Sequence, residues 1–254
     1  MSLIDTHIHL TDSRYSELSP EKLLAKAKLV GVQKVITLGV DLVDSIAAAE
    51  LADCNDNVFF CAGVHPHEAD KFNNQDIIEI KRLLTHPKCV GIGEVGLDFY
   101  YEFSKVDTQK KVFLQMIDLA NHAKPIVLHT RGAEKEVLEI IKEIPGKYHC
   151  HSYTGDISLL GDYLDAGAFF SFNGMMSFKG AQNVRDIAKE VPLDRIMVES
   201  DGPYLAPVPY RGGINLPEYL KTTAEVLAET LGLSYDEISN ITTKNAERFF
   251  WDAV

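Results

Sequence analysis

The sequence predicts a (β/α)8 barrel of the TIM-barrel type, and three observations favour this α/β fold class. Eight short apolar runs alternate with eight amphipathic stretches, as expected for repeated strand–helix units. A length of 254 residues suits one such barrel, so we expect residues 1–254 to form a single domain. No glycine-rich phosphate loop follows the first apolar run, which argues against the main alternative, an open doubly wound sheet.

The predicted strands are mostly continuous apolar runs, as expected for parallel strands covered on both faces. They span residues 3–9, 33–39, 58–64, 89–95, 125–129, 147–151, 168–173 and 195–201. The stretches between them carry apolar residues at helical spacing, as Val112, Met116 and Ala120 do in the fourth stretch. These predicted helices span residues 20–30, 42–53, 75–85, 107–123, 132–144, 156–166, 178–190 and 217–231. The tail at 234–250 predicts two further short helices packed on the barrel.

Composition and charge narrow the class of protein. With 46% hydrophobic residues the chain can bury a large core, and no run of about 18 apolar residues predicts a membrane span. The N-terminus shows no features of a secretory signal, and the four cysteines, which lack a CxxC spacing, suggest reduced thiols. We therefore expect a cytoplasmic protein without a membrane or obligate protein partner. The net charge of −12 argues against a broad basic groove for duplex DNA, but not against a nucleic-acid end held by metal ions.

Six potential metal ligands occur where predicted strands give way to loops. They are His7, His9, Glu94, His129, His151 and Asp201. The carboxyl ends of barrel strands meet at one mouth, so these side chains are expected to converge there. His7 and His9 are two residues apart on one strand and share a face. A His-x-His pair alone is equally consistent with two surface histidines. Together with the other strand ends, it predicts a metal-hydrolase centre.

Six motifs containing these residues appear in a recognisable order. They are Asp5-Thr6-His7-Ile8-His9, Gly63-Val64-His65-Pro66-His67, Gly93-Glu94-Val95-Gly96-Leu97-Asp98, Leu128-His129-Thr130-Arg131, His151-Ser152-Tyr153-Thr154-Gly155 and Glu199-Ser200-Asp201-Gly202-Pro203-Tyr204-Leu205. The set resembles the TatD family of metal-dependent deoxyribonucleases, within the amidohydrolase-like metal-barrel superfamily. The resemblance implies a two- or three-metal barrel that hydrolyses phosphodiesters, typically trimming DNA from the 3′ end. It also implies one ion among His7, His9, Glu94 and Asp201, and a second among Glu94, His129 and His151, bridged by Glu94.

The chemistry of these residues agrees with that layout. A bridging carboxylate can hold two ions about 3.5–4 Å apart, the spacing of two-metal phosphoryl chemistry. Asp201 is the natural group to accept the proton of the attacking water. A donor set rich in imidazole favours Zn, Mn, Fe, Co or Ni over Mg or Ca by intrinsic affinity, although family members are often magnesium-activated. We therefore expect two divalent ions (Zn, Mn, Mg, Co or Ni), with Glu94 and Asp201 as catalytic residues.

Three residues are candidates for binding substrate. His65 ends the third strand and could contact phosphate or hydrogen-bond a metal ligand. Arg131 lies two residues past His129 and could clamp phosphate or form a surface salt bridge. Arg211 lies in the loop after the eighth strand, where Gly213 and Leu216 replace residues that are charged in family members. Four aromatic residues near the mouth could stack bases or pack in the core: Phe99, Tyr153, Phe172 and Tyr204.

The remaining polar residues near these motifs are expected to have structural roles. His149 lies one step deeper than His151 and is predicted to lie in the core or to support a ligand, not to bind an ion itself. Glu199 is predicted to orient a metal ligand rather than to bind an ion. His67, His86 and His122 are predicted to be structural or solvent-facing.

Three functional hypotheses follow from different classes. The leading one is a hydrolase of DNA phosphodiesters that acts at single-stranded or frayed ends. The second uses the same metals on another bond, such as an aminoacyl ester of transfer RNA, a cyclic amide or a phosphotriester, because the fold alone does not decide function. The third is a metal-dependent binding protein without turnover, which the complete ligand set argues against.

Overall fold

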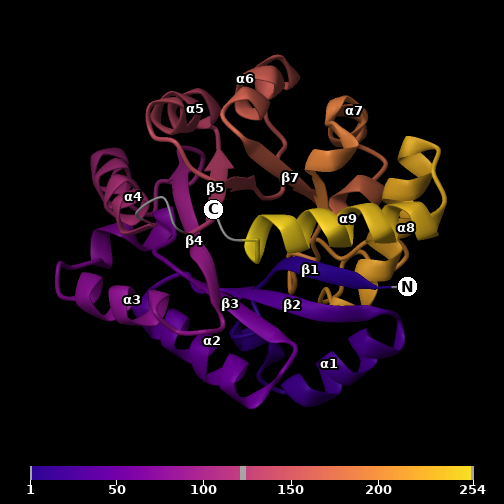
Figure 1. Ribbon diagram of the computed structural model, residues 1–254, viewed down its shortest axis with the longest axis horizontal. Helices are drawn as coiled ribbons and strands as arrows, with labels where there is room; N and C mark the ends of the chain where they lie inside the picture. The colour runs from indigo at the N-terminus through magenta and orange to yellow at the C-terminus, as the bar shows by residue number, and fades with distance from the viewer. Residues whose placement is uncertain (1, 121–123, 253–254) are drawn as a thin grey trace.

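The structure is a computed structural model that describes residues 2–120 and 124–252, and its strands follow one another around a barrel (Figure 1). Each strand pairs in parallel with the next along the chain. The strands are β1 (Leu3–Ile8), β2 (Val32–Leu38), β3 (Val58–Ala62), β4 (Cys89–Asp98), β5 (Ile126–Arg131), β6 (Tyr148–Cys150), β7 (Ala168–Phe172) and β8 (Ile196–Val198). This confirms the predicted (β/α)8 fold.

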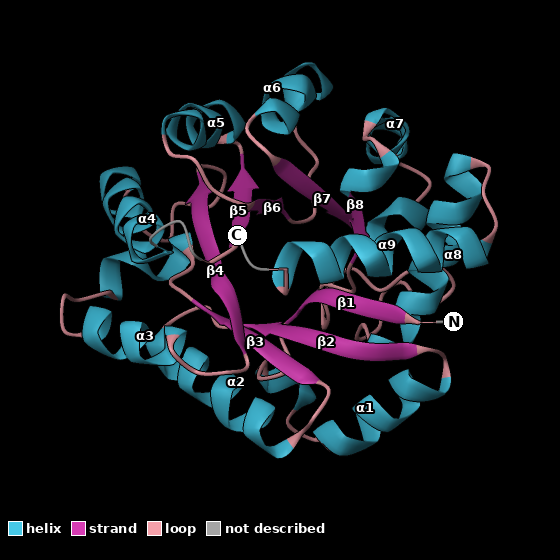
Figure 2. Ribbon diagram, viewed as in Figure 1, coloured by secondary structure: helices cyan, strands magenta, loops and turns pink. Residues whose placement is uncertain are grey.

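Helices surround the strands as an outer layer, and a last helix lies across the barrel (Figure 2). The outer helices are α1 (Pro20–Leu29), α2 (Leu42–Cys54), α3 (Asp76–Leu84), α4 (Val106–Ala120), α5 (Glu134–Glu143), α6 (Leu160–Asp165), α7 (Gln182–Glu190) and α8 (Leu220–Leu231), and the last helix is α9 (Tyr235–Phe250). The predicted end of the fourth helix at 121–123 lies outside the described residues. Within the described ranges, no helix combines the length and apolar character needed to cross a membrane.

The barrel closes where the first strand meets the chain just beyond the last one. The amide of His9 donates to the carbonyl of Gly202 at 2.7 Å, and the amide of Asp201 donates to the carbonyl of His7 at 2.9 Å. The prediction that the eighth strand reaches residue 201 is wrong, because β8 ends at Val198 and Asp201 has a φ of 54°, which strand geometry excludes. The same bonds rule out the open-sheet alternative.

Irregular pairing on β1 and β4 positions two of the ligand-bearing segments. Ile92 lies opposite Ile126 and Val95 opposite Leu128, so β4 has one extra residue around Glu94. Such a bulge re-aims the side chain it carries. A comparable shift on β1 lies between Asp5 and Ile8.

Close approach of β4 to β5 depends on Gly96. A Cβ built at Gly96 would lie 2.0 Å from the carbonyl oxygen of His129, so only glycine fits between these strands. The approach brings the Glu94 and His129 side chains together.

Helix α9 covers the N-terminal end of the barrel. Ala246, Phe249 and Phe250 pack with interior residues that include Ile4 and Met197. The side chain of Asn245 also donates to the carbonyls of Leu193 and Ile196 at the start of β8. The prediction that this tail packs on the barrel is confirmed.

The tail forms one helix, so the prediction of two short helices is wrong. A capping box between Ser234 and Glu237 starts α9. No glycine or proline follows to interrupt it before Trp251.

We expect Phe249→Ala to lower the free energy of unfolding by about 3–5 kcal/mol, because it leaves a cavity among buried side chains. Phe249 is 1% exposed, whereas Leu29 on α1 is 86% exposed. Leu29→Ala is the control and should change the stability by no more than about 0.5 kcal/mol. Urea unfolding followed by circular dichroism measures both, and equal midpoints for the two variants would contradict the assigned role of α9.

Candidate metal centre

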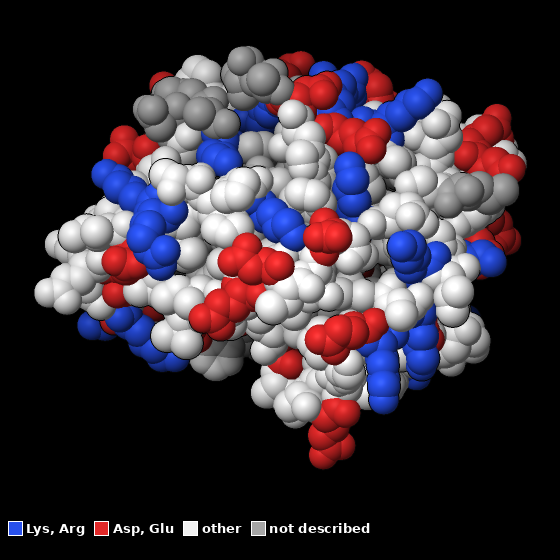
Figure 3. Space-filling view, turned by 60° about the horizontal axis from the view of Figure 1, so that its bottom comes forward, with Lys and Arg blue, Asp and Glu red and all other residues white. Residues whose placement is uncertain are grey.

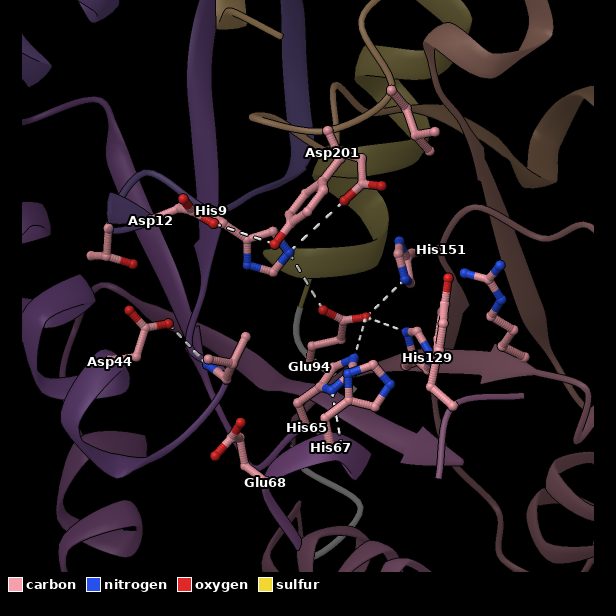
Figure 4. Close-up of a pocket in the computed structure, with 16 residues that line it drawn as sticks. His9, Asp12, Asp44, His65, His67, Glu68, Glu94, His129, His151 and Asp201 are labelled. Carbon is pink, nitrogen blue, oxygen red and sulfur yellow. Dashed lines mark hydrogen bonds and ion pairs between the residues drawn. The ribbon is translucent and has the colours of Figure 1, made fainter. Parts of the chain in front are cut away.

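A cavity of about 520 Å³ lies at the carboxyl ends of the strands (Figure 4). It is lined by residues of β4 and β5 and of the segments that follow β1, β2, β3, β6 and β8. All predicted ligands except the fully buried His7 line this cavity. The structure therefore brings the six residues together at the predicted mouth.

Four donor groups converge on one point at the β1 side of the cavity. The Nε2 atoms of His7 and His9 are 3.2 Å apart, and each lies 3.5 Å from Oε2 of Glu94. Oδ1 of Asp201 lies 3.7 and 3.8 Å from the same two nitrogens. Four donors placed tetrahedrally at about 2.0–2.2 Å from an ion such as Zn²⁺ would be roughly 3.4 Å apart. The donor spacing therefore fits a single divalent ion.

The other oxygen of Glu94 faces a second group of imidazoles. Oε1 lies 2.8 Å from Nδ1 of His129 and 2.8 Å from Nε2 of His151, with Nε2 of His65 at 3.6 Å. Figure 4 shows the carboxylate between His9 on one side and His129 and His151 on the other. One carboxylate thus serves both donor groups, as a bridging ligand must.

The buried carboxylates in the cavity also favour the binding of cations. Burial raises the pKa of Asp201 well above its usual value, and the nearby carboxylates of Glu199 and Glu94 raise it further. Among the described residues, none of these three carboxylates forms an ion pair with a lysine or arginine. Uncompensated buried charge is costly, and bound divalent ions would remove that cost. Burial also lowers the pKa of His7 to about 4, which keeps its ring neutral and able to bind an ion.

Three of the ligand histidines are also held by a protein oxygen, which contacts the ring nitrogen that faces away from Glu94. Nε2 of His129 lies 3.1 Å from Oδ2 of Asp98, and Nδ1 of His151 lies 3.5 Å from Oε1 of Glu199. Nδ1 of His9 lies 3.3 Å from the carbonyl of Leu38. Such contacts set the ring orientation and the nitrogen that is presented to a metal. Glu199 therefore occupies the orienting position predicted for it.

Asp98 was missed from the sequence, although a signal was present. It lies four residues after Glu94 on β4, and the strand extends to Asp98 rather than ending at residue 95. The β-strand alternation places residues 94, 96 and 98 on one face. The side chain of Asp98 is fully buried and holds both His129 and His67.

Of the two alternatives predicted for His67, a structural or a solvent-facing side chain, the contacts agree with the structural one. A 3-10 helix at Pro66–Lys71 starts beside His65 and turns His67 back to the cavity, where its Nε2 lies 2.8 Å from Asp98. His149 is fully buried, as predicted, with Nε2 2.6 Å from Ser171. His86 contacts Asp53 at the surface, and His122 lies outside the described residues.

The predicted substrate contacts fall in different places. His65 and Arg131 line the cavity. The guanidinium of Arg131 has no ion pair within the described ranges, so the salt-bridge alternative for Arg131 is not found there. Arg211 lies over the ring of Phe178 at 4.2 Å and does not line the cavity.

The aromatic predictions divide in the same way. Tyr153 and Phe172 are buried in the core, so their stacking role is wrong, and Phe99 is partly buried against the core. Tyr204 lines the cavity and is 45% exposed.

Comparison with known proteins gives concordant results. Residues 4–251 match the protein family described as "TatD related DNase". The "Uncharacterized metal-dependent hydrolase YabD" of Bacillus subtilis is 36% identical over 98% of this chain and 98% of its own length, and YcfH of Escherichia coli, with the same description, is 36% identical over 98% and 96%. The crystal structure of YjjV, a TatD homolog from Escherichia coli, superposes with a TM-score of 0.91 at 23% identity, covering 98% of this chain and 97% of that one. A TatD family hydrolase from Entamoeba histolytica gives 0.88 at 20%, covering 99% and 98%.

We expect Glu94→Ala to lose most of its bound metal, because both donor groups lose their common carboxylate. Glu68→Ala is the matched control, since Glu68 lines the same cavity but pairs with Lys71. The metal content of each purified variant is measured by elemental analysis after reconstitution, with circular dichroism to check folding. A folded Glu94→Ala variant with the metal content of the parent chain would contradict the bridging role.

Proposed function

The chain belongs to the TatD-related DNase family of metal-dependent hydrolases, and on this premise we propose that it trims nucleotides from the 3′ ends of single-stranded or frayed DNA. The observation that carries the proposal is the position of Glu94. Its two oxygens face separate donor groups at the floor of an open cavity. That arrangement suits the in-line displacement at phosphorus that two-metal sites catalyse.

Bound divalent cations would lower the pKa of a water molecule and neutralise charge on the phosphate. The chain's own residues then have separate tasks. His7, His9, Glu94 and Asp201 would hold one cation, and Glu94, His129 and His151 would hold the other. Asp98 and Glu199 keep the rings of His129 and His151 in the binding orientation.

Asp201 is the proposed proton acceptor. Its side chain accepts no hydrogen bond from the part of the chain that the structure describes, so one carboxylate oxygen faces the cavity. The left-handed φ of 54° is tolerated by aspartate and directs the side chain inward from the segment after β8. In the reaction, the oxygen of water bonds to phosphorus and Asp201 takes its proton. The bond from phosphorus to the 3′ oxygen of the preceding nucleotide breaks, and that oxygen is protonated.

The charge around the cavity supports action at strand ends. Among the described residues that line the cavity, Arg131 is the one lysine or arginine. Five lining residues are acidic: Asp12, Asp44, Glu68, Glu94 and Asp201. On the face shown in Figure 3, basic and acidic side chains are interspersed rather than gathered into a basic area. A continuous polyanion would therefore find few cationic contacts, whereas one phosphate at a terminus can be held by the metals and Arg131.

The proposal is tested by incubating the metal-reconstituted protein with labelled single-stranded DNA, duplex DNA, RNA and an aminoacyl-transfer RNA. Stepwise release of mononucleotides from the 3′ end of single-stranded DNA is expected. Faster turnover of the aminoacyl ester than of any phosphodiester would replace the proposal with the second hypothesis.

We expect Asp201→Asn to reduce turnover by about 10²–10⁴-fold, the range for loss of a general base. Asparagine keeps the shape and one oxygen donor, so part of the metal should remain bound. Turnover is measured under metal-saturating conditions, with metal content determined on the same samples. Near-normal turnover in a fully loaded variant would show that another group accepts the proton.

Substrate affinity should depend only weakly on salt, with a slope that corresponds to about two or three phosphate contacts at 0.7 per contact. Arg131→Ala should reduce the slope by about 0.7, and Lys28→Ala on the outer face of α1 should leave it unchanged. Affinity is measured by fluorescence anisotropy over a salt series. A steep slope, or efficient cutting of circular single-stranded DNA, would contradict the preference for ends.

A further inference from the structure

Three aromatic side chains are exposed on the loop between β4 and α4. Tyr100 is 65% exposed, Tyr101 is 40% exposed and Phe103 is 67% exposed. Exposed aromatic side chains gathered in one short segment at the edge of a cavity are typical of a binding surface. Tyr101 also lines the cavity that holds the metal ligands. We call these three residues the aromatic rim.

The aromatic rim is held in place by the same carboxylate that orients a metal ligand. Oδ1 of Asp98 accepts hydrogen bonds from the amides of Tyr100 and Tyr101 at 2.9 and 2.8 Å. Its other oxygen, Oδ2, contacts His129 at 3.1 Å. Because one buried side chain makes all these contacts, the rim has a defined position relative to the metal centre.

Arg131 lies beside the aromatic rim, and its guanidinium N–H groups contact no acceptor among the described residues. Its guanidinium carbon lies 4.5 Å from the ring centre of Tyr100 and 4.7 Å from that of Tyr101. Throughout the described residues, its guanidinium has no hydrogen bond or ion pair with the protein. A planar cation in this state can stack on a ring and bind phosphate at its edge.

The rings themselves form an extendable stack. The planes of Tyr101 and Phe103 are 17° apart with centres separated by 5.6 Å. Phe103 also contacts the edge of His67, with ring centres 4.8 Å apart. Its exposed fraction leaves much of the ring open for another flat group.

We propose that the aromatic rim and Arg131 form a subsite for an unpaired nucleobase of the DNA strand whose phosphate lies in the metal centre. The proposal rests on the proposed function and names the part of the substrate that this surface binds. Flat aromatic faces with one free guanidinium match a base and its phosphate. Stacking tolerates any base, so the subsite should bind without sequence preference. Bases inside a duplex are stacked on both faces, which accounts for a preference for single strands.

The opposite side of the mouth offers one aromatic ring, Tyr204, that Arg14 already covers. Tyr204 has the guanidinium of Arg14 at 3.7 Å from its ring centre, and Arg14 is tied to Asp12. The edge of the His9 ring also packs against Tyr204. The contacts favour the aromatic rim as the base-binding side.

The test compares three substitutions of one residue. Phe103→Ala removes the side chain, Phe103→Leu keeps apolar bulk without a ring, and Phe103→Tyr keeps the ring. Each is measured on 3′-labelled single-stranded oligonucleotides in which one abasic nucleotide is moved stepwise from the 3′ end. Affinity is measured by anisotropy and cleavage by single-turnover kinetics, and circular dichroism and metal content check the integrity of each variant.

Loss of one stacked base is expected to weaken affinity roughly 5- to 150-fold in Phe103→Ala and in Phe103→Leu, with Phe103→Tyr unchanged. In the parent chain one abasic position should produce the same loss, and that position should cause no further loss in Phe103→Ala. This coupling identifies the base that the ring binds.

Two results would overturn the subsite and one would overturn the proposed function. If Phe103→Leu binds and cuts the oligonucleotide as the parent chain does, no base stacks there. If losses from abasic positions and from Phe103→Ala multiply at every position, the ring and the base do not interact. If the parent chain cuts no oligonucleotide yet binds it with the coupling described, the subsite stands and the proposed function fails.

Discussion

The burial of carboxylate charge at the mouth of the barrel is the constraint on which the rest of the site depends. Glu94 is 2% exposed and lies among imidazoles from β1, β5 and the segments after β3 and β6. Burial alone would raise the pKa of Glu94, but the imidazoles of His151, His65 and His7 hold it well below its usual value. Glu199 and Asp201 add further negative charge nearby. In their protonated form the imidazoles balance part of this charge, and bound cations would balance it with the rings neutral.

The two ends of the barrel differ in what they contribute: one end stabilises the fold and the other carries the polar site. At the N-terminal end, α9 and the interior apolar residues supply burial and close packing. At the carboxyl end, buried polar side chains occupy positions where leucine or phenylalanine would contribute more to the stability of a core. His149 and Ser171 mark the boundary, since both are fully buried, with His149 hydrogen-bonded to Ser171 and Ser171 to Glu199. The apolar packing below this polar layer offsets the free energy that burying its polar groups costs.

The fold and the ligand set could be predicted from the sequence because both follow from simple periodicities. Strands recur with helices between them, and each ligand lies at or just beyond the end of a predicted strand. Asp98 was missed because β4 continues past its apolar segment, and the contact of His67 with Asp98 because a short 3-10 helix follows His65. The exposed positions of Tyr100 and Tyr101 depend on how the loop is tied to Asp98. Such contacts depend on where side chains lie in space, which a periodic sequence pattern does not predict.

The closure between β1 and the segment after β8 has a consequence during protein synthesis. His7 and Asp201 supply donors to the same point, although one lies near the start of the chain and the other follows the last strand. The two are also joined by a backbone hydrogen bond. A nascent chain that still lacks its final strand can therefore offer His7, His9 and Glu94 but neither Asp201 nor the closed wall. The growing polypeptide is thereby kept from assembling the complete donor set until translation has passed residue 201.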